Sequence, residues 1–207
     1  MDEKIKSLYQ GLYDKFGISP ESVKARDKHQ QEERFSNLIS LTEIKESDSV
    51  LDIGCGSAEL LKYLRGKGFK GEYYGIDFIS DFVNHAKKEF NNDSKAFFDE
   101  KNILVDDFEN KFDWVVLSGV FNDKRGNSEE YFYKTINKMY EVCNKGIVFN
   151  SLSKYVDYED KLLYYTYPDL TLKYCIENLS KYTIINTNYQ LKKDTIPFEY
   201  SICVFNK

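Results

Sequence analysis

Histidine, proline and cysteine are scarce in this 207-residue chain, which has two, three and four of them respectively. The four cysteines are scattered without a Cys-x-x-Cys pair, so we expect neither a zinc site nor a disulfide framework, and we predict reduced thiols. No apolar run reaches 18 residues, and the first residues lack the apolar core of a signal peptide. We therefore expect a cytoplasmic protein without a membrane partner.

A basic surface for nucleic acid is also missing from the sequence. The formal net charge is −5, and acids and bases are mixed without a block of Lys and Arg long enough to follow a phosphate backbone. Nucleic acid is therefore not expected as a partner. At this length the chain fits one domain, and it is long enough to bury a sizeable core.

The most informative segment is 49–58, with the sequence Ser-Val-Leu-Asp-Ile-Gly-Cys-Gly-Ser-Ala. An apolar β-type run leads into Asp52, two close glycines and an apparent helix start, a corner at which backbone N–H groups can approach a ligand. A pyrophosphate prefers a helix N-terminus without negative charge, so Asp52 favours a cation instead. S-adenosylmethionine carries an ammonium and a sulfonium, and Asp52 could hydrogen-bond the ammonium. Cys55 is interpreted as a small residue between the glycines and not as a nucleophile.

The pattern Asp52-x-Gly54-x-Gly56 after an apolar strand resembles motif I of the class I S-adenosylmethionine-dependent methyltransferases, of the small-molecule type. Residues 71–77 then predict a second strand that ends in Asp77, 21 residues after Gly56. The resemblance implies that Asp77 accepts hydrogen bonds from both ribose hydroxyls of the cofactor. It also implies S-adenosylmethionine as the cofactor and S-adenosylhomocysteine as the product.

Two other interpretations share these residues. An NAD-dependent oxidoreductase would also place an acid at Asp77, but it is disfavoured by Asp52 and by Glu59, which stands where Gly-x-Gly-x-x-Gly requires its third glycine. A tight turn in a purely structural α/β domain is the second alternative.

The fold class follows from alternating β-type and helical segments, which predict an α/β protein with a parallel sheet covered on both faces. The expected helices lie near 57–66, 79–90 and 128–144, with another from Pro168, and the expected parallel strands are about 49–53, 72–77, 95–99, 112–117 and 146–150. Two further runs, 182–189 and 198–205, have no helix between them, so they must pair antiparallel or leave the sheet. The resemblance, over about 48–207, implies a Rossmann-like, seven-stranded, mostly parallel sheet in the order 3-2-1-4-5-7-6 with the last strand antiparallel.

Residues 1–47 are predicted to form an N-terminal helical cap on a compact methyltransferase domain at 48–207. A first helix should end near Gly17, and a second should run from Ser22 to about Ile44. Helices ahead of motif I commonly close over the cofactor in this family. Gln31 and Arg34, one helical turn apart, could therefore reach its carboxylate or the substrate.

Other cofactor contacts are implied by position in the family pattern. Asn102 and Ile103 fall where the adenine edge is received; the usual acid is missing there, and Asp99 or Glu100 could replace it. The predicted cofactor-binding residues are Gln31, Arg34, Asp52, Gly54, Cys55, Gly56, Asp77, Phe78, Ile79, Asn102, Ile103, Ser118 and Gly119.

Segment 118–122 follows the fourth predicted strand, where the transferable methyl group points in this family. It contains no proline, which excludes the Pro-Pro-aromatic motif of amino-methyltransferases that act on DNA bases. Tyrosines gather between 155 and 182, and flat rings with polar tips suit a sugar or an aromatic small molecule. The predicted substrate contacts are Phe121, Asn122, Tyr155 and Tyr165.

A general base is hard to assign, because the chain has only two histidines, His85 in the predicted helix after the second strand and His29 in the N-terminal cap. Tyr155, Asp157 and Glu199 are the candidates that we would test. No metal is expected, since Asp123 stands alone after the fourth strand, without the acidic pair of metal-using relatives. The prediction is methyl transfer to a hydroxyl or amine of a small polar molecule, with a carbohydrate or natural-product precursor preferred. The alternative is a non-catalytic S-adenosylmethionine-binding module or partner subunit.

Overall fold

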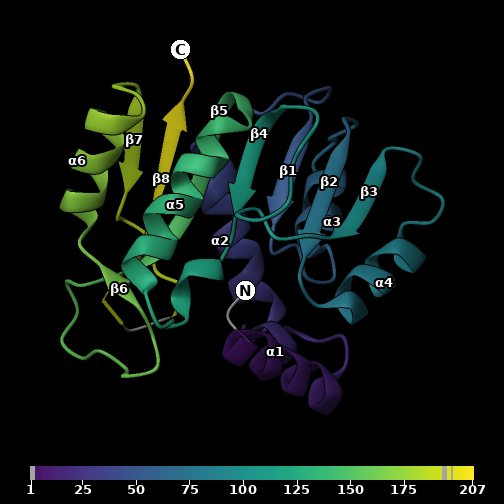
Figure 1. The fold of residues 1–207 in the computed structure, drawn as a ribbon, viewed down its shortest axis with the longest axis horizontal. Coiled ribbons are helices and arrows are strands. Elements are labelled where there is room, and N and C mark those ends of the chain that lie inside the picture. The colour runs from purple at the N-terminus through teal and green to yellow at the C-terminus, as the bar shows by residue number, and fades with distance from the viewer. Residues whose placement is uncertain (1–2, 193–194, 197) are drawn as a thin grey trace.

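One twisted, mostly parallel sheet dominates the computed structural model, which describes residues 3–192, 195–196 and 198–207 (Figure 1). Its strand order over these residues is β3-β2-β1-β4-β5-β8-β7, with the short β6 beside the end of β5. The strands are β1 (Val50–Ile53), β2 (Tyr73–Asp77), β3 (Ala96–Glu100), β4 (Phe112–Leu117), β5 (Cys143–Ser153), β6 (Tyr165–Thr166), β7 (Thr183–Asn186) and β8 (Glu199–Phe205).

The predicted order 3-2-1-4-5-7-6 is confirmed, since β8 and β7 are the seventh and sixth predicted strands. β8 runs antiparallel to β5, from Gly146 opposite Phe205 to Leu152 opposite Glu199. β7 pairs antiparallel with the other side of β8. The two-residue strand β6 was not predicted, because it forms only where β5 extends beyond the expected segment 146–150.

Helices cover both faces of the sheet and create two cores. On one face, α5 (Ser128–Glu141) and α6 (Pro168–Asn178) contribute Phe132, Met139 and Cys175 to the core. On the other face lie α2 (Lys28–Ser40), α3 (Glu59–Gly66) and α4 (Ser80–Glu89), which contribute side chains such as Leu38 and Leu61. β1 lies between both cores, so all four of its residues are buried and its carboxyl end is held rigidly.

The N-terminal segment consists of α1 (Glu3–Phe16), the short 3₁₀ helix η1 (Pro20–Val23) and α2. The prediction of one continuous helix from Ser22 was wrong. Lys24 has a left-handed backbone with φ of 57°, which ends η1, and Asp27 caps α2 by accepting a 2.8 Å hydrogen bond from the Gln30 N–H. In Figure 1, α1 lies at the edge where the carboxyl ends of β1 and β2 meet.

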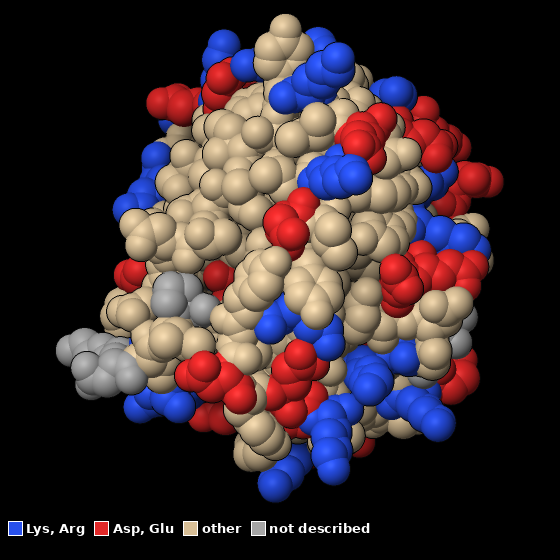
Figure 2. All heavy atoms as spheres, turned by 90° about the vertical axis from the view of Figure 1, so that its left-hand side faces the viewer, with Lys and Arg blue, Asp and Glu red and all other residues tan. Residues whose placement is uncertain are grey.

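The surface carries intermixed charge on the face shown in Figure 2, where Lys and Arg alternate with Asp and Glu around uncharged residues. Lys173 and Glu177, one turn apart on α6, form one of the ion pairs on the surface of the protein. Within the described ranges, no helix is both long and apolar enough to cross a membrane. No group of three or more His, Cys, Asp and Glu in this part of the chain could hold a metal ion.

Candidate active site

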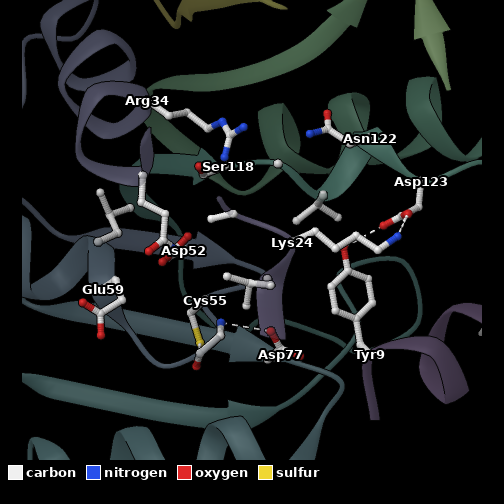
Figure 3. Close-up of a pocket in the computed structure, with 18 of the residues that line it drawn as sticks. Tyr9, Lys24, Arg34, Asp52, Cys55, Glu59, Asp77, Ser118, Asn122 and Asp123 are labelled. Atoms are coloured by element: carbon white, nitrogen blue, oxygen red, sulfur yellow. Dashed lines mark hydrogen bonds and ion pairs between the residues drawn. The ribbon is translucent and has the colours of Figure 1, made fainter. Parts of the chain in front are cut away.

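A cavity of about 360 Å³ lies where the carboxyl ends of β1, β2 and β4 meet. Its walls come from the loop after β1, the end of β2, the loop after β4 and the start of β8, and the N-terminal segment closes it (Figure 3). Cavities of this size hold small molecules in other proteins.

The loop after β1 is an unusual backbone turn. Gly54, Gly56 and Ala58 have φ angles of 72°, 52° and 62°, a left-handed region that favours glycine. A Cβ on Gly54 would lie 2.4 Å from Cγ2 of Val120, so this glycine is also required by packing against the 3₁₀ helix η2 (Val120–Asn122). The turn brings the N–H of Gly56 to the carboxylate of Asp77, at 3.0 Å.

Asp52 occupies the third position of β1, and its side chain faces the cavity with only 3% exposure. The hydroxyl of Tyr73 donates a hydrogen bond to its Oδ2. Among the described residues no Lys, Arg or His forms an ion pair with it. Burial, together with the negative charge of Asp77, raises the pKa of Asp52 to about 7.

Asp77 ends β2 and is similarly buried. Its two oxygens accept hydrogen bonds from backbone N–H groups, Oδ2 from Gly56 at 3.0 Å and Oδ1 from Ile79 at 2.9 Å. Burial outweighs these hydrogen bonds and raises the pKa of Asp77 to about 6. The cavity therefore contains two carboxylates without a basic partner, an arrangement that favours a positively charged ligand.

Arg34 reaches into the same cavity from α2. Its Nε and Nη2 donate to the two oxygens of Glu199 at 2.9 and 3.1 Å, a bidentate pair in which both side chains are largely buried. The hydroxyl of Tyr189 donates to the same carboxylate at 3.0 Å.

The sequence matches the family profile described as "Methyltransferase domain" over residues 44–189. A Mycobacterium tuberculosis protein named "Putative methyltransferase Rv1506c" is 30% identical over 154 residues, which cover 72% of this chain and 90% of that protein. The chain belongs to the class I methyltransferases.

Solved methyltransferases share the fold. Magnesium protoporphyrin IX methyltransferase from Synechocystis, with bound S-adenosylhomocysteine, matches with a TM-score of 0.67 at 14% identity, over 100% of this chain and 96% of that chain. Human N-acetylserotonin methyltransferase in complex with S-adenosylmethionine has the same TM-score and identity, over 97% of this chain and 59% of that chain. The cofactor of this methyltransferase family is S-adenosylmethionine.

The cavity of this methyltransferase fits that cofactor chemically. S-adenosylmethionine has a cationic ammonium, a cationic sulfonium and a ribose diol, and Asp52 and Asp77 are buried acceptors without basic partners. Gly119 has a left-handed backbone with a φ of 77°. A Cβ built on it would meet no atom closer than 3.8 Å, so the backbone of Gly119 is accessible from the cavity that it lines. When bound, the cofactor supplies the activated methyl group.

Most of the predicted cofactor residues line this cavity together with two of the other candidates. The lining includes Gln31, Arg34, Asp52, Gly54, Cys55, Gly56, Asp77, Phe78, Ile79, Ser118, Gly119, Asn122 and Glu199. Predicted residues that the structure does not bring to the cavity lining are Asn102, Ile103, Phe121, Tyr155, Asp157 and Tyr165.

Local contacts account for the positions of most of these residues. The side-chain oxygen of Asn102 accepts from the N–H of Leu104 at 3.0 Å, and Ile103 is buried in the core. Phe121 packs on Phe132 with ring centroids 4.5 Å apart. The remaining three lie after β5: Tyr155 is exposed and donates to Asp169 at 2.8 Å, Asp157 is exposed, and the Tyr165 hydroxyl accepts from the N–H of Asp160 at 3.1 Å.

Several lining residues were missed by the sequence analysis. Tyr9 and Lys24 both contact Asp123, and Arg125 stacks on Tyr131 with its guanidinium carbon 4.1 Å from the ring centroid. The contacts of Tyr9 and Lys24 join segments about 100 residues apart, for which one sequence contains no local signal. The sequence did contain one signal for Arg125, because Lys124 and Arg125 directly follow Asp123 in the loop after the fourth predicted strand.

Proposed function

We propose that this protein transfers a methyl group from S-adenosylmethionine to a hydroxyl or amine of a small polar molecule, with a carbohydrate or natural-product precursor preferred. The observation that carries the proposal is the pair Asp52 and Asp77, both buried at the cavity and neither paired with a basic side chain in the described residues. A dinucleotide pyrophosphate would add further negative charge beside them.

In this proposal the lining residues divide between the two ends of the cofactor. Asp52 accepts from the ammonium and favours the sulfonium charge, while Asp77 accepts from the ribose hydroxyls. Phe78 and Ile79 flank the adenine from the segment that follows β2. Arg34, with Gln31 beside it on α2, binds the carboxylate.

The acceptor would approach past the loop after β4. Asn122 lies there, and its Oδ1 is buried without a hydrogen-bond partner in the described structure. Leu152, Leu163 and Phe198 add apolar surface nearby. Support for a small acceptor comes from the size of the cavity, about 360 Å³, and from Tyr9, Val23 and Lys24 of the N-terminal segment, which help to line it.

Methyl transfer is an in-line displacement at a carbon that the sulfonium already activates, so the chain's residues act mainly by orientation and by excluding water. Glu199 is poorly placed to take a proton, because both of its oxygens already accept hydrogen bonds from Arg34. An unprotonated amine or an ionised acidic hydroxyl therefore suits this site best, whether an amino sugar or a natural-product precursor carries it.

The same observation supports the alternative of a non-catalytic cofactor-binding module. The decisive experiment incubates the protein with methyl-labelled S-adenosylmethionine and panels of sugars, amines and phenols, and measures label transfer and S-adenosylhomocysteine release. Transfer to a small acceptor supports the enzyme, whereas tight cofactor binding without transfer to any panel supports the module. Binding of NAD instead of S-adenosylmethionine in parallel calorimetry would overturn both.

A further inference from the structure

A partly buried network of polar side chains leads from the outer strands of the sheet to Arg34. Asn186 on β7 donates to Asn37 on α2 at 2.6 Å, and Asn37 donates to Ser201 on β8 at 2.6 Å. The Tyr189 hydroxyl lies 3.0 Å from both Ser201 Oγ and Glu199 Oε1. Every link is a hydrogen bond between side chains, and satisfied networks of this kind hold their members in one geometry.

This network of hydrogen bonds ends at the guanidinium of Arg34. Two of its nitrogens, Nε and Nη2, are used by Glu199. The third nitrogen, Nη1, has no hydrogen-bond partner among the described residues and faces the backbone of Gly119, where a Cβ would lie 3.8 Å away. Because a guanidinium is planar, fixing two nitrogens also fixes the direction of the third.

The guanidinium of Arg34 lines the same cavity as the carboxylate of Asp52. Figure 3 shows Arg34 and Asp52 at one end, opposite Tyr9, Lys24 and Asp123. An amino acid carries its ammonium and its carboxylate on one carbon, so protein groups that bind them must be neighbours. Asp52 suits the ammonium and Arg34 Nη1 suits the carboxylate.

We propose that Glu199, itself held by Tyr189, is a positioning residue that directs Nη1 of Arg34 at the carboxylate of the cofactor's methionine part. This inference rests on the proposed function and adds to it a role for two residues that do not touch the reacting atoms. Glu199 then serves cofactor affinity and not proton transfer.

Two ligands test this assignment, because only one of them carries the carboxylate that Arg34 is proposed to bind. S-adenosylhomocysteine has the amino-acid part and 5′-methylthioadenosine lacks it. Calorimetry should be run with both on the wild type, Glu199→Gln, Tyr189→Phe and Arg34→Lys, with Glu141→Gln as the matched control. Glu141 is an exposed carboxylate that pairs with Lys138 on α5, away from the cavity.

We expect Glu199→Gln and Arg34→Lys to weaken S-adenosylhomocysteine by about tenfold or more, the size of losing a hydrogen bond to a charged group. Tyr189→Phe should have a smaller effect in the same direction, and it keeps the test available if Glu199→Gln unfolds. Affinity for 5′-methylthioadenosine should stay within about twofold of the wild type in all variants.

Two results would overturn the inference while the proposed function stands. One is a folded Glu199→Gln variant with unchanged S-adenosylhomocysteine affinity, and the other is equal weakening of both ligands, which indicates general damage to the cavity. A wild type that binds neither ligand would overturn the proposed function first, and the inference with it.

Discussion

The hydroxyl of Tyr9 donates a 2.6 Å hydrogen bond to the carboxylate of Asp123, which lies 114 residues further along the chain. Asp123 is 4% exposed, and the ammonium of Lys24 donates to its other oxygen. The N-terminal segment is thus joined to the loop after β4 at the cavity.

Removing one of these contacts should loosen the segment. In Tyr9→Phe, Asp123 keeps Lys24 but loses a hydrogen bond to its charged oxygen, a loss of about 1.5–3 kcal/mol in local stability. We expect faster amide exchange over residues 3–24, measured by hydrogen-exchange mass spectrometry. Tyr158→Phe is the control, because Tyr158 is 77% exposed and lies outside the cavity. Equal exchange in the two variants would refute a closing role for Tyr9.

The geometry of the loop after β1 predicts how a substitution at Gly54 changes stability. Gly54→Ala puts a Cβ at a φ of 72° and 2.4 Å from Val120 Cγ2, so the free energy of unfolding should fall by about 2–4 kcal/mol. Gly126→Ala is the matched control, because a Cβ there meets nothing within 4 Å and its φ is not positive. Urea unfolding of both variants measures the difference, and indistinguishable midpoints would contradict it.

The core of the fold could be predicted because its signals are local. An apolar run that ends in Asp52 and two glycines defines β1 and its loop, and two strands without a helix between them define the antiparallel edge. Such patterns need only neighbouring residues. The helix start at Lys28 was missed because Lys24 adopts a left-handed backbone that few lysines adopt.

The candidate site was only partly predictable, because its walls come from distant segments. Arg34 was expected at the cofactor, yet its partner Glu199 lies 165 positions away, and no pattern in one sequence joins them. The family pattern also predicted that Asn102 contacts the adenine edge, but Asn102 does not line the cavity. The carbonyl of Asn102 is used by the N–H of Leu104 instead of facing the cavity.

Asp52→Asn should separate stability from cofactor affinity. At pH 8 the wild-type carboxylate is ionised and buried without a basic partner, so the neutral amide should stabilise the fold. The melting temperature should rise by about 2–4 °C for each kcal/mol by which the free energy of unfolding increases. Loss of the charge should weaken S-adenosylmethionine by about 1.5–3 kcal/mol. Thermal unfolding and calorimetry measure the two effects. A variant that binds as tightly as the wild type would remove Asp52 from the ammonium site.

The pH dependence of the same residue gives the last prediction. Burial raises the pKa of Asp52 to about 7, above its unfolded value, so the folded protein holds a proton that the unfolded chain releases. Its contribution to stability is therefore fully present below about pH 4 and is lost as pH rises through about 7. The stability gained by Asp52→Asn should accordingly be largest at pH 8, smaller at pH 5 and nearly absent only at about pH 3.

Binding should follow the opposite trend, because only the ionised carboxylate attracts the ammonium. With a pKa of about 7, ionisation alone makes S-adenosylhomocysteine bind about tenfold more weakly at pH 6 than at pH 8. Asp77, whose pKa is raised to about 6, adds to this trend toward lower pH. Calorimetry between pH 6 and pH 8 on the wild type and on Asp52→Asn isolates the contribution of Asp52. The affinity of the variant should change much less with pH than that of the wild type. A wild-type affinity that is flat from pH 6 to pH 8 would mean that Asp52 does not bind the ammonium as a charge.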